Sequence, residues 1–106
     1  MTILFVDDMK YPRHFGLPDN TPIARTAEVA WRIAKRRSVN KPIEELWLDH
    51  DLSEDGMNGF ELLRKMVERG MAPKKVVCIS YNIPGVERIQ NYCMDNDIPY
   101  ERRMMQ

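Results

Sequence analysis

The chain has 106 residues, of which 43% are hydrophobic and 30% charged, as expected for one globular domain with a single core. Basic and acidic residues number 16 each, and this balance argues against the broad cationic surface that non-specific nucleic-acid binding requires. Cys78 and Cys93 lie within apolar patterns without metal-ligand spacing, and no signal peptide or long apolar span is visible. We therefore expect one domain over residues 1–106, in the cytoplasm, with both thiols in the core and no membrane segment.

The first quarter of the chain predicts a buried strand followed by a long loop. Residues 3–6 (ILFV) form a continuous apolar run, which is typical of a strand buried on both faces. Residues 9–22 contain three prolines and Gly16, so they predict an irregular segment in place of a helix. A loop of this length in a small domain is usually functional or mobile.

A short strand at residues 23–25 and a helix are expected next. Thr26 is a suitable N-cap, and the helix should end at residues 40–42, which contain Asn, Lys and Pro. The apolar residues at helical spacing predict its buried face: Ala27, Ala30, Trp31 and Ala34.

Residues 46–48 (LWL) predict the next strand, and a turn-rich loop follows it. The Asp55–Gly56 pair in this loop is typical of a turn cap. Asn58, followed three residues later by Glu61, matches a capping box and predicts a helix that ends at Gly70. Its predicted buried face is Phe60, Leu63, Met66 and Val67.

The last third of the chain repeats the alternation of strand and helix. Residues 76–80 (VVCIS) predict another buried strand, and Asn82, Pro84 and Gly85 lead into a third helix. The inward face of this helix should carry Val86, Ile89 and Cys93, and residues 98–101 could form a closing strand. Alternating strands and helices predict an α/β three-layer sandwich with a parallel sheet of about four to five strands.

Acidic residues stand where two of the predicted strands end. Asp7 and Asp8 follow the first, and the LDHDL stretch places Asp49 and Asp51 around His50 after the central one. Ligand sites of such sheets lie at the carboxyl ends of the strands, so these carboxylates should gather and repel one another. A hard divalent cation such as Mg²⁺ would relieve that repulsion. The alternative is that single aspartates only cap turns.

Two histidines leave alternatives open. His50, between two carboxylates, could donate a proton near a phosphate, or it could point to the opposite face of the sheet and be hydrogen-bonded there. His14 lies in the loop with Lys10, Tyr11 and Arg13. That loop could fold over the site as a phosphate-contacting lid, or it could be a solvated surface loop.

Five stretches of this chain resemble one family. VDDMKYP, ARTAEVA, LDHDL, GMNGFELL and ISYNIPG are similar to motifs of the cyclic-phosphate-processing receiver domain, a relative of response-regulator receivers. The resemblance implies a receiver-like, flavodoxin-like fold whose first helix is replaced by a loop. It implies Mg²⁺, or Mn²⁺, at Asp7, Asp8 and Asp49. It also matches His50 and Asp51 to the rest of the LDHDL element, and Ser80, Asn82 and Gly85 to the motif after the fourth strand.

The chain departs from the family at two motif positions. Ile79 stands where the family pattern has histidine, and Lys10 stands where it has arginine. If that histidine is a general acid or base in relatives, His50 or His14 would have to serve here. An ordinary receiver also has a lysine on its last strand, but no lysine follows Lys75, and Arg102 is the nearest substitute.

Three classes of function are compatible with these residues. The first is a divalent-metal-dependent phosphoesterase acting on cyclic phosphates of nucleotides or RNA ends. The second is a non-catalytic module that binds the same ligands, and the third is an atypical receiver phosphorylated on Asp49. Oligomeric state is open. For the enzyme, the catalytic candidates are Asp49, His50 and Asp51, and the phosphate-binding candidates are Lys10, Ser80, Asn82, Gly85 and Arg102.

Overall fold

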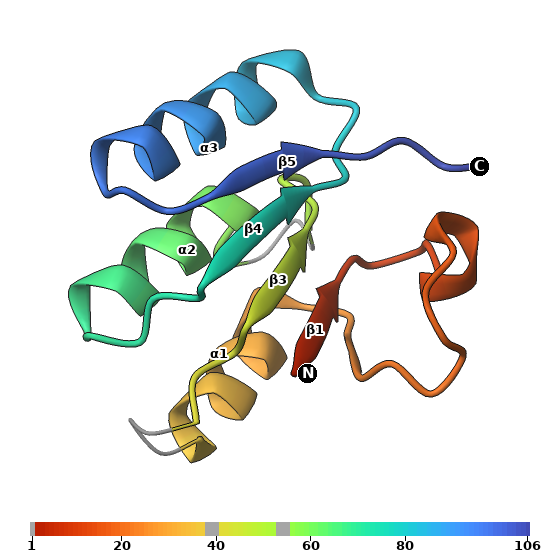
Figure 1. Cartoon of the computed structure of the whole chain (residues 1–106), viewed down its shortest axis with the longest axis horizontal. Helices are drawn as coiled ribbons and strands as arrows, with labels where there is room; N and C mark the ends of the chain where they lie inside the picture. The colour runs from red at the N-terminus through yellow and green to blue at the C-terminus, as the bar shows by residue number, and fades with distance from the viewer. Residues whose placement is uncertain (1, 38–40, 53–55) are drawn as a thin grey trace.

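The computed structural model describes residues 2–37, 41–52 and 56–106, and its centre is one parallel sheet (Figure 1). The strands lie in the order β2-β1-β3-β4-β5, which is the flavodoxin-like order. The predicted receiver-like α/β fold is therefore confirmed. The strands are β1 (Ile3–Val6), β2 (Ile23–Ala24), β3 (Glu45–Leu48), β4 (Lys75–Cys78) and β5 (Tyr100–Arg102).

Each helix begins at the cap that the sequence predicts. The Thr26 side chain accepts a hydrogen bond from the Val29 amide, and both bonds of the capping box between Asn58 and Glu61 are present. Gly70 follows the second helix with a φ of 74°, a conformation that favours glycine. The helices are α1 (Ala27–Arg36), α2 (Gly59–Glu68) and α3 (Ile83–Asp95).

A few predicted boundaries differ from the structure. Helix α1 ends at Arg36, before the predicted 40–42, of which Asn40 lies outside the described residues. The turn cap predicted at Asp55 also lies outside them. The closing strand is shifted from 98–101 to Tyr100–Arg102, since Val76, Val77 and Cys78 pair with those residues.

The two faces of the sheet have different covers. All three helices lie on one face and enclose the larger core with strand residues such as Leu46 and Val76, as Figure 1 shows. The second face carries a smaller apolar cluster, made of Phe5, Phe15, Trp47, Val77 and Ile79. Phe15 comes from the loop at 9–22, which contains the short 3₁₀ helix η1 (Pro12–Phe15). The loop at 9–22 thus forms the third layer of the sandwich. It takes the place of the first helix, as the family resemblance implied.

The chain end lies against the same loop. The Gln106 amide donates to the His14 carbonyl at 2.9 Å, and the Arg103 guanidinium lies 6.0 Å from the centre of the Trp47 ring.

Cys78 and Cys93 are both buried and unpaired, as predicted, and burial raises the pKa of Cys93 to about 12. Within the described residues, none of the helices has the length and apolarity needed to span a bilayer.

Candidate functional site

Three carboxylates meet at the carboxyl edge of the sheet. Asp7 and Asp8 directly follow β1, and Asp49 directly follows the neighbouring strand β3. One oxygen from each lies within 4.8 Å of the others. Asp7 and Asp49 are only 1% and 6% exposed, whereas Asp8 is exposed to solvent. The parallel register places Val6 beside Leu48, so the residues that follow these strands are neighbours.

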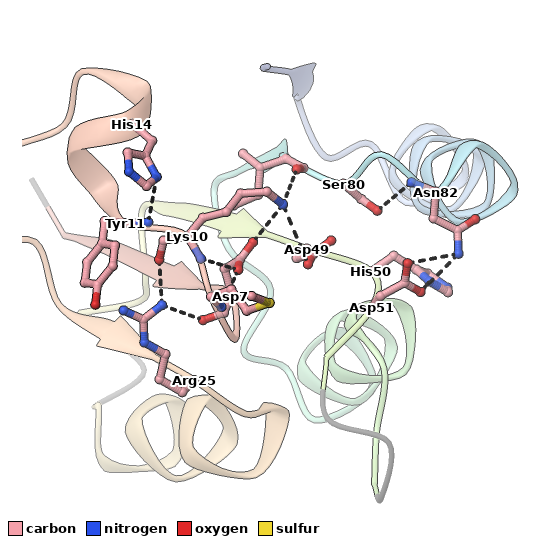
Figure 2. Close-up of polar contacts among 12 residues, drawn as sticks. Asp7, Lys10, Tyr11, His14, Arg25, Asp49, His50, Asp51, Ser80 and Asn82 are labelled. Carbon is pink, nitrogen blue, oxygen red and sulfur yellow. Dashed lines mark hydrogen bonds and ion pairs between the residues drawn. The ribbon is translucent and has the colours of Figure 1, made fainter. Parts of the chain in front are cut away.

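Lys10 supplies a cation to this acid cluster. Its Nζ lies 3.1 Å from Asp7 Oδ2 and 3.9 Å from Asp49 Oδ2, and it donates to the Ile79 carbonyl at 3.3 Å (Figure 2). The other Asp7 oxygen accepts from the Met9 and Lys10 amides, each at 2.8 Å. The loop therefore turns tightly around Asp7 and brings Lys10 back over the acids. The sequence assigned Lys10 to phosphate binding, and the structure places its ammonium among the carboxylates.

Arg25 fixes this turn from below, and the sequence analysis did not select it as a site residue. Its Nη1 donates to the Asp7 carbonyl at 3.2 Å and to the Lys10 carbonyl at 2.5 Å (Figure 2). Two guanidinium groups lie over the Tyr11 ring, with Arg13 at 4.5 Å and Arg25 at 4.6 Å from the ring centre. The only signal in the sequence was the place of Arg25 within the ARTAEVA motif.

The electrostatics of the cluster favour a further cation. Burial, and then the nearby Asp7 charge, raise the pKa of Asp49 from an ordinary 3.8 to about 6, although Lys10 and the Ser80 hydroxyl act in the opposite direction. Three ionised carboxylates and one ammonium leave two uncompensated negative charges. A divalent cation carries the charge that would balance them, and oxygen ligands suit Mg²⁺ or Mn²⁺. The acidic triad could therefore hold a metal ion.

His50 and Asp51 form a second group beside the first. His50 Nδ1 lies 3.0 Å from Asp51 Oδ1, and Asn82 Nδ2 donates to the same carboxylate at 3.0 and 3.3 Å. The hydrogen bond from His50, more than that from Asn82, lowers the pKa of Asp51. The Asp51 side chain is 63% exposed and is not part of the triad. Of the two aspartates in LDHDL, Asp49 is thus the one that faces the acids.

The orientation of His50 is set by the start of helix α3. A Cβ on Gly85 would lie 2.4 Å from His50 Cγ, so the imidazole packs directly against the glycine backbone. This contact puts His50 on the helix-covered side of the sheet, near the site but not between the carboxylates (Figure 2). Its remaining ring nitrogen, Nε2, makes no hydrogen bond to the described residues.

The remaining phosphate-binding candidates lie at the ends of β4 and β5. Ser80 is fully buried, and its Oγ accepts from the Asn82 amide at 3.1 Å. Asn82 Oδ1 caps α3 by accepting from the Gly85 amide at 3.0 Å. Arg102 is exposed and donates through Nη2 to the Ser80 carbonyl at 3.3 Å. His14 Nδ1 accepts from the Tyr11 amide at 3.3 Å within η1, so its imidazole takes part in the loop's own hydrogen bonds.

Gly59 explains why the segment after LDHDL must approach the site so closely. A Cβ at this position would lie 2.0 Å from the Asp49 carbonyl oxygen. The Gly59 amide instead donates to the His50 carbonyl at 2.8 Å. The first residue of α2 therefore holds the backbone of Asp49 and His50 in place.

The sheet order, the acid cluster at its carboxyl edge and the ammonium paired with the acid after the central strand define a receiver-like domain. The chain belongs to the family described as the cyclic-phosphate processing receiver domain, whose family model matches residues 2–95. No curated protein and no solved structure matches the chain. The family that the motifs resemble is thereby confirmed, and the domain is associated with cyclic-phosphate processing.

Proposed function

We propose that this domain hydrolyses cyclic phosphates of nucleotides or RNA ends with a divalent metal ion. The observation that carries the proposal is the buried Asp49, whose pKa is raised to about 6 in a cluster that keeps two uncompensated negative charges. A phosphate anion would be repelled by such a site alone. It would be attracted once a divalent cation occupies the triad.

The reaction requires one bond to form and one to break. A water oxygen bonds to phosphorus, and one of the two ester P–O bonds of the ring breaks, which leaves a phosphomonoester and a free hydroxyl. Mg²⁺ or Mn²⁺, when bound, would polarise the phosphoryl oxygen. Asp7, Asp8 and Asp49 are the residues that would hold it. One proton must leave the water, and one must reach the departing oxygen.

The chain's own residues offer groups for binding and proton transfer. His50 Nδ1 is engaged by Asp51, so Nε2 is the atom that would accept the water proton and return one to the departing oxygen. Lys10 Nζ beside Asp49 and the exposed Arg102 at the end of β5 are cations that would contact the phosphate. Ser80 and Asn82 would act chiefly by holding Asp49 and Asp51 in place, as their hydrogen bonds indicate.

A non-catalytic binding module is the second candidate, and Ile79 favours it. The family pattern has histidine here, whereas the Ile79 side chain is buried in the smaller core with Trp47 and Val77. This position therefore offers no ionisable group. A module of this kind would keep the metal and phosphate contacts and lack turnover.

The test is a screen of 2′,3′-cyclic and 3′,5′-cyclic nucleotides and RNA with a cyclic-phosphate end, with Mg²⁺ or Mn²⁺ and with EDTA. Both bound ligand and product are measured, for wild type, Asp49→Asn and the matched control Asp95→Asn, an exposed acid at the far end of α3. Metal-dependent product that Asp49→Asn abolishes and Asp95→Asn retains supports the enzyme. Tight binding without product supports the module. Acid-labile labelling of Asp49 by acetyl phosphate would instead support an atypical receiver.

A further inference from the structure

Exposed apolar side chains are concentrated on the segments that leave the carboxyl edge of the sheet. Most surfaces expose such residues singly, and a group of them beside a polar site commonly marks a binding surface. In the part of the chain that the structure describes, six of the seven large exposed apolar residues follow β1, β4 or β5 at the carboxyl edge of the sheet. These residues are Met9, Tyr11, Tyr81, Ile83, Met104 and Met105.

These six residues form an apolar rim, and its two tyrosines differ in how much of the ring other side chains cover. Tyr11 already has a guanidinium group stacked near it from Arg13 and another from Arg25. Tyr81 is 47% exposed, and within the described ranges no other aromatic ring stacks on it. Among the described residues, the cation over this ring is Lys10, whose Nζ lies 4.9 Å from the ring centre. Of these two tyrosines, Tyr81 is therefore the one whose ring has more free surface for a ligand.

Lys10 joins this ring to the acid cluster. The same Nζ that lies beside Tyr81 is 3.1 Å from Asp7 and 3.9 Å from Asp49. A phosphate that contacts the Lys10 ammonium at the acid cluster would therefore lie close to the exposed Tyr81 ring. The neighbouring residues are fixed, because Ser80 is fully buried and Asn82 caps α3.

We propose that Tyr81 is a stacking platform for a nucleobase, so that the ligand is a nucleoside cyclic phosphate, and not the cyclic phosphate of a base-free polyol. This inference rests on the proposed function and adds the residue that would recognise the base. Stacking on an aromatic ring tolerates any base, since every base has a π face. The site should therefore prefer a base to no base and discriminate little between purines and pyrimidines.

The experiment compares affinities for 2′,3′-cyclic AMP, 2′,3′-cyclic UMP and glycerol 1,2-cyclic phosphate in Mg²⁺, with a short RNA bearing a cyclic-phosphate end as a fourth ligand. The variants are Tyr81→Leu, which keeps an apolar side chain, Tyr81→Phe, which keeps the ring, and the control Ile83→Ala on the same rim. Tyr81→Leu should weaken nucleotide binding on the order of tenfold, the effect expected for one stacked base. It should leave glycerol cyclic phosphate unchanged, and Tyr81→Phe and Ile83→Ala should bind nucleotides like wild type.

The possible failures are distinguishable. If wild type binds glycerol cyclic phosphate as tightly as the nucleotides, the stacking role is overturned and the proposed function stands. If Tyr81→Leu weakens both kinds of ligand equally, the ring acts only through Lys10, which also overturns it. If wild type binds none of the cyclic phosphates, the proposed function is wrong and the inference with it. Preference for the RNA over both mononucleotides, lost in Tyr81→Leu, would identify the RNA end as the source of the base.

Discussion

Replacing Asp49 by asparagine tests the acid cluster most directly. The pKa of Asp49 is raised from 3.8 to about 6, first by burial and then by Asp7, so the folded protein holds this proton more tightly than the unfolded chain. Stability should therefore fall as the pH rises from about 4 through about 6, by about 3 kcal/mol in total. Below the unfolded pKa both states are protonated, and the penalty is absent. Asp49→Asn removes the charge and keeps the shape.

The variant should be more stable than wild type in EDTA at about pH 7.5. The raised pKa already includes the attraction to Lys10. The variant recovers only part of the 3 kcal/mol because the asparagine NH₂ group replaces one oxygen and cannot accept a hydrogen bond there, and a gain of about 1 to 2 kcal/mol is expected. One kcal/mol shifts the midpoint of a domain of this size by roughly 4 to 8 °C, so thermal melts resolve the effect. At about pH 4 the difference between the two proteins should nearly vanish.

Metal ions should reverse the order of the two proteins. Binding to the folded state alone stabilises wild type by about 2.7 kcal/mol at a hundredfold excess over Kd, whereas Asp49→Asn has lost a charged ligand and gains much less. Asp95→Asn, at an exposed position, should behave like wild type throughout. If wild type shows no shift with Mg²⁺ or Mn²⁺, and Asp49→Asn is less stable at both pH values, the aspartates only cap turns and the metal site does not exist.

Three further substitutions test other parts of the site. Lys10→Met removes the cation tethered to Asp7, so Mn²⁺ affinity measured by calorimetry should rise, on the order of tenfold, and an unchanged or lower affinity would contradict the charge argument. Gly85→Ala places a methyl group 2.4 Å from His50 Cγ, so the ring must move; turnover should fall with metal affinity kept, and full activity would exclude a catalytic His50. Ile79→His buries an imidazole in the smaller core and should cost about 1 to 3 kcal/mol in chemical unfolding, so a fully stable variant would show that the position can turn toward the site.

Much of the fold follows from local patterns in the sequence. Continuous apolar runs such as ILFV mark strands buried on both faces, and these strands form the centre of the sheet. Thr26, Asn58 and Asn82 each have a side chain that bonds a free helix amide, which fixes the helix starts within a residue. The edge strand β5 was less well placed, because a three-residue strand has little pattern of its own and its register is set by pairing with β4.

The acid cluster was also visible in the sequence, but the directions of its side chains were not. LDHDL offers two aspartates and a histidine in succession, and the close approach of Gly59 and Gly85 helps to determine where Asp49 and His50 lie. Gly59 is ten residues away from Asp49 in the sequence, and Gly85 is thirty-five residues away from His50. The loop at 9–22 predicts no regular path, so the return of Lys10 to Asp7 could not be foreseen either.

The position of Lys10 and the loss of the first helix have a common physical cause. A helix directly after the acid pair would carry residue 10 along its axis, whereas here the Asp7 carboxylate accepts the amides of Met9 and Lys10 and turns the chain back on itself. That turn lets the Lys10 ammonium reach both Asp7 and the Ile79 carbonyl at the end of β4. Arg102, the residue expected to replace the last-strand lysine, bonds the Ser80 carbonyl instead. The loop therefore supplies the cation that the last strand lacks.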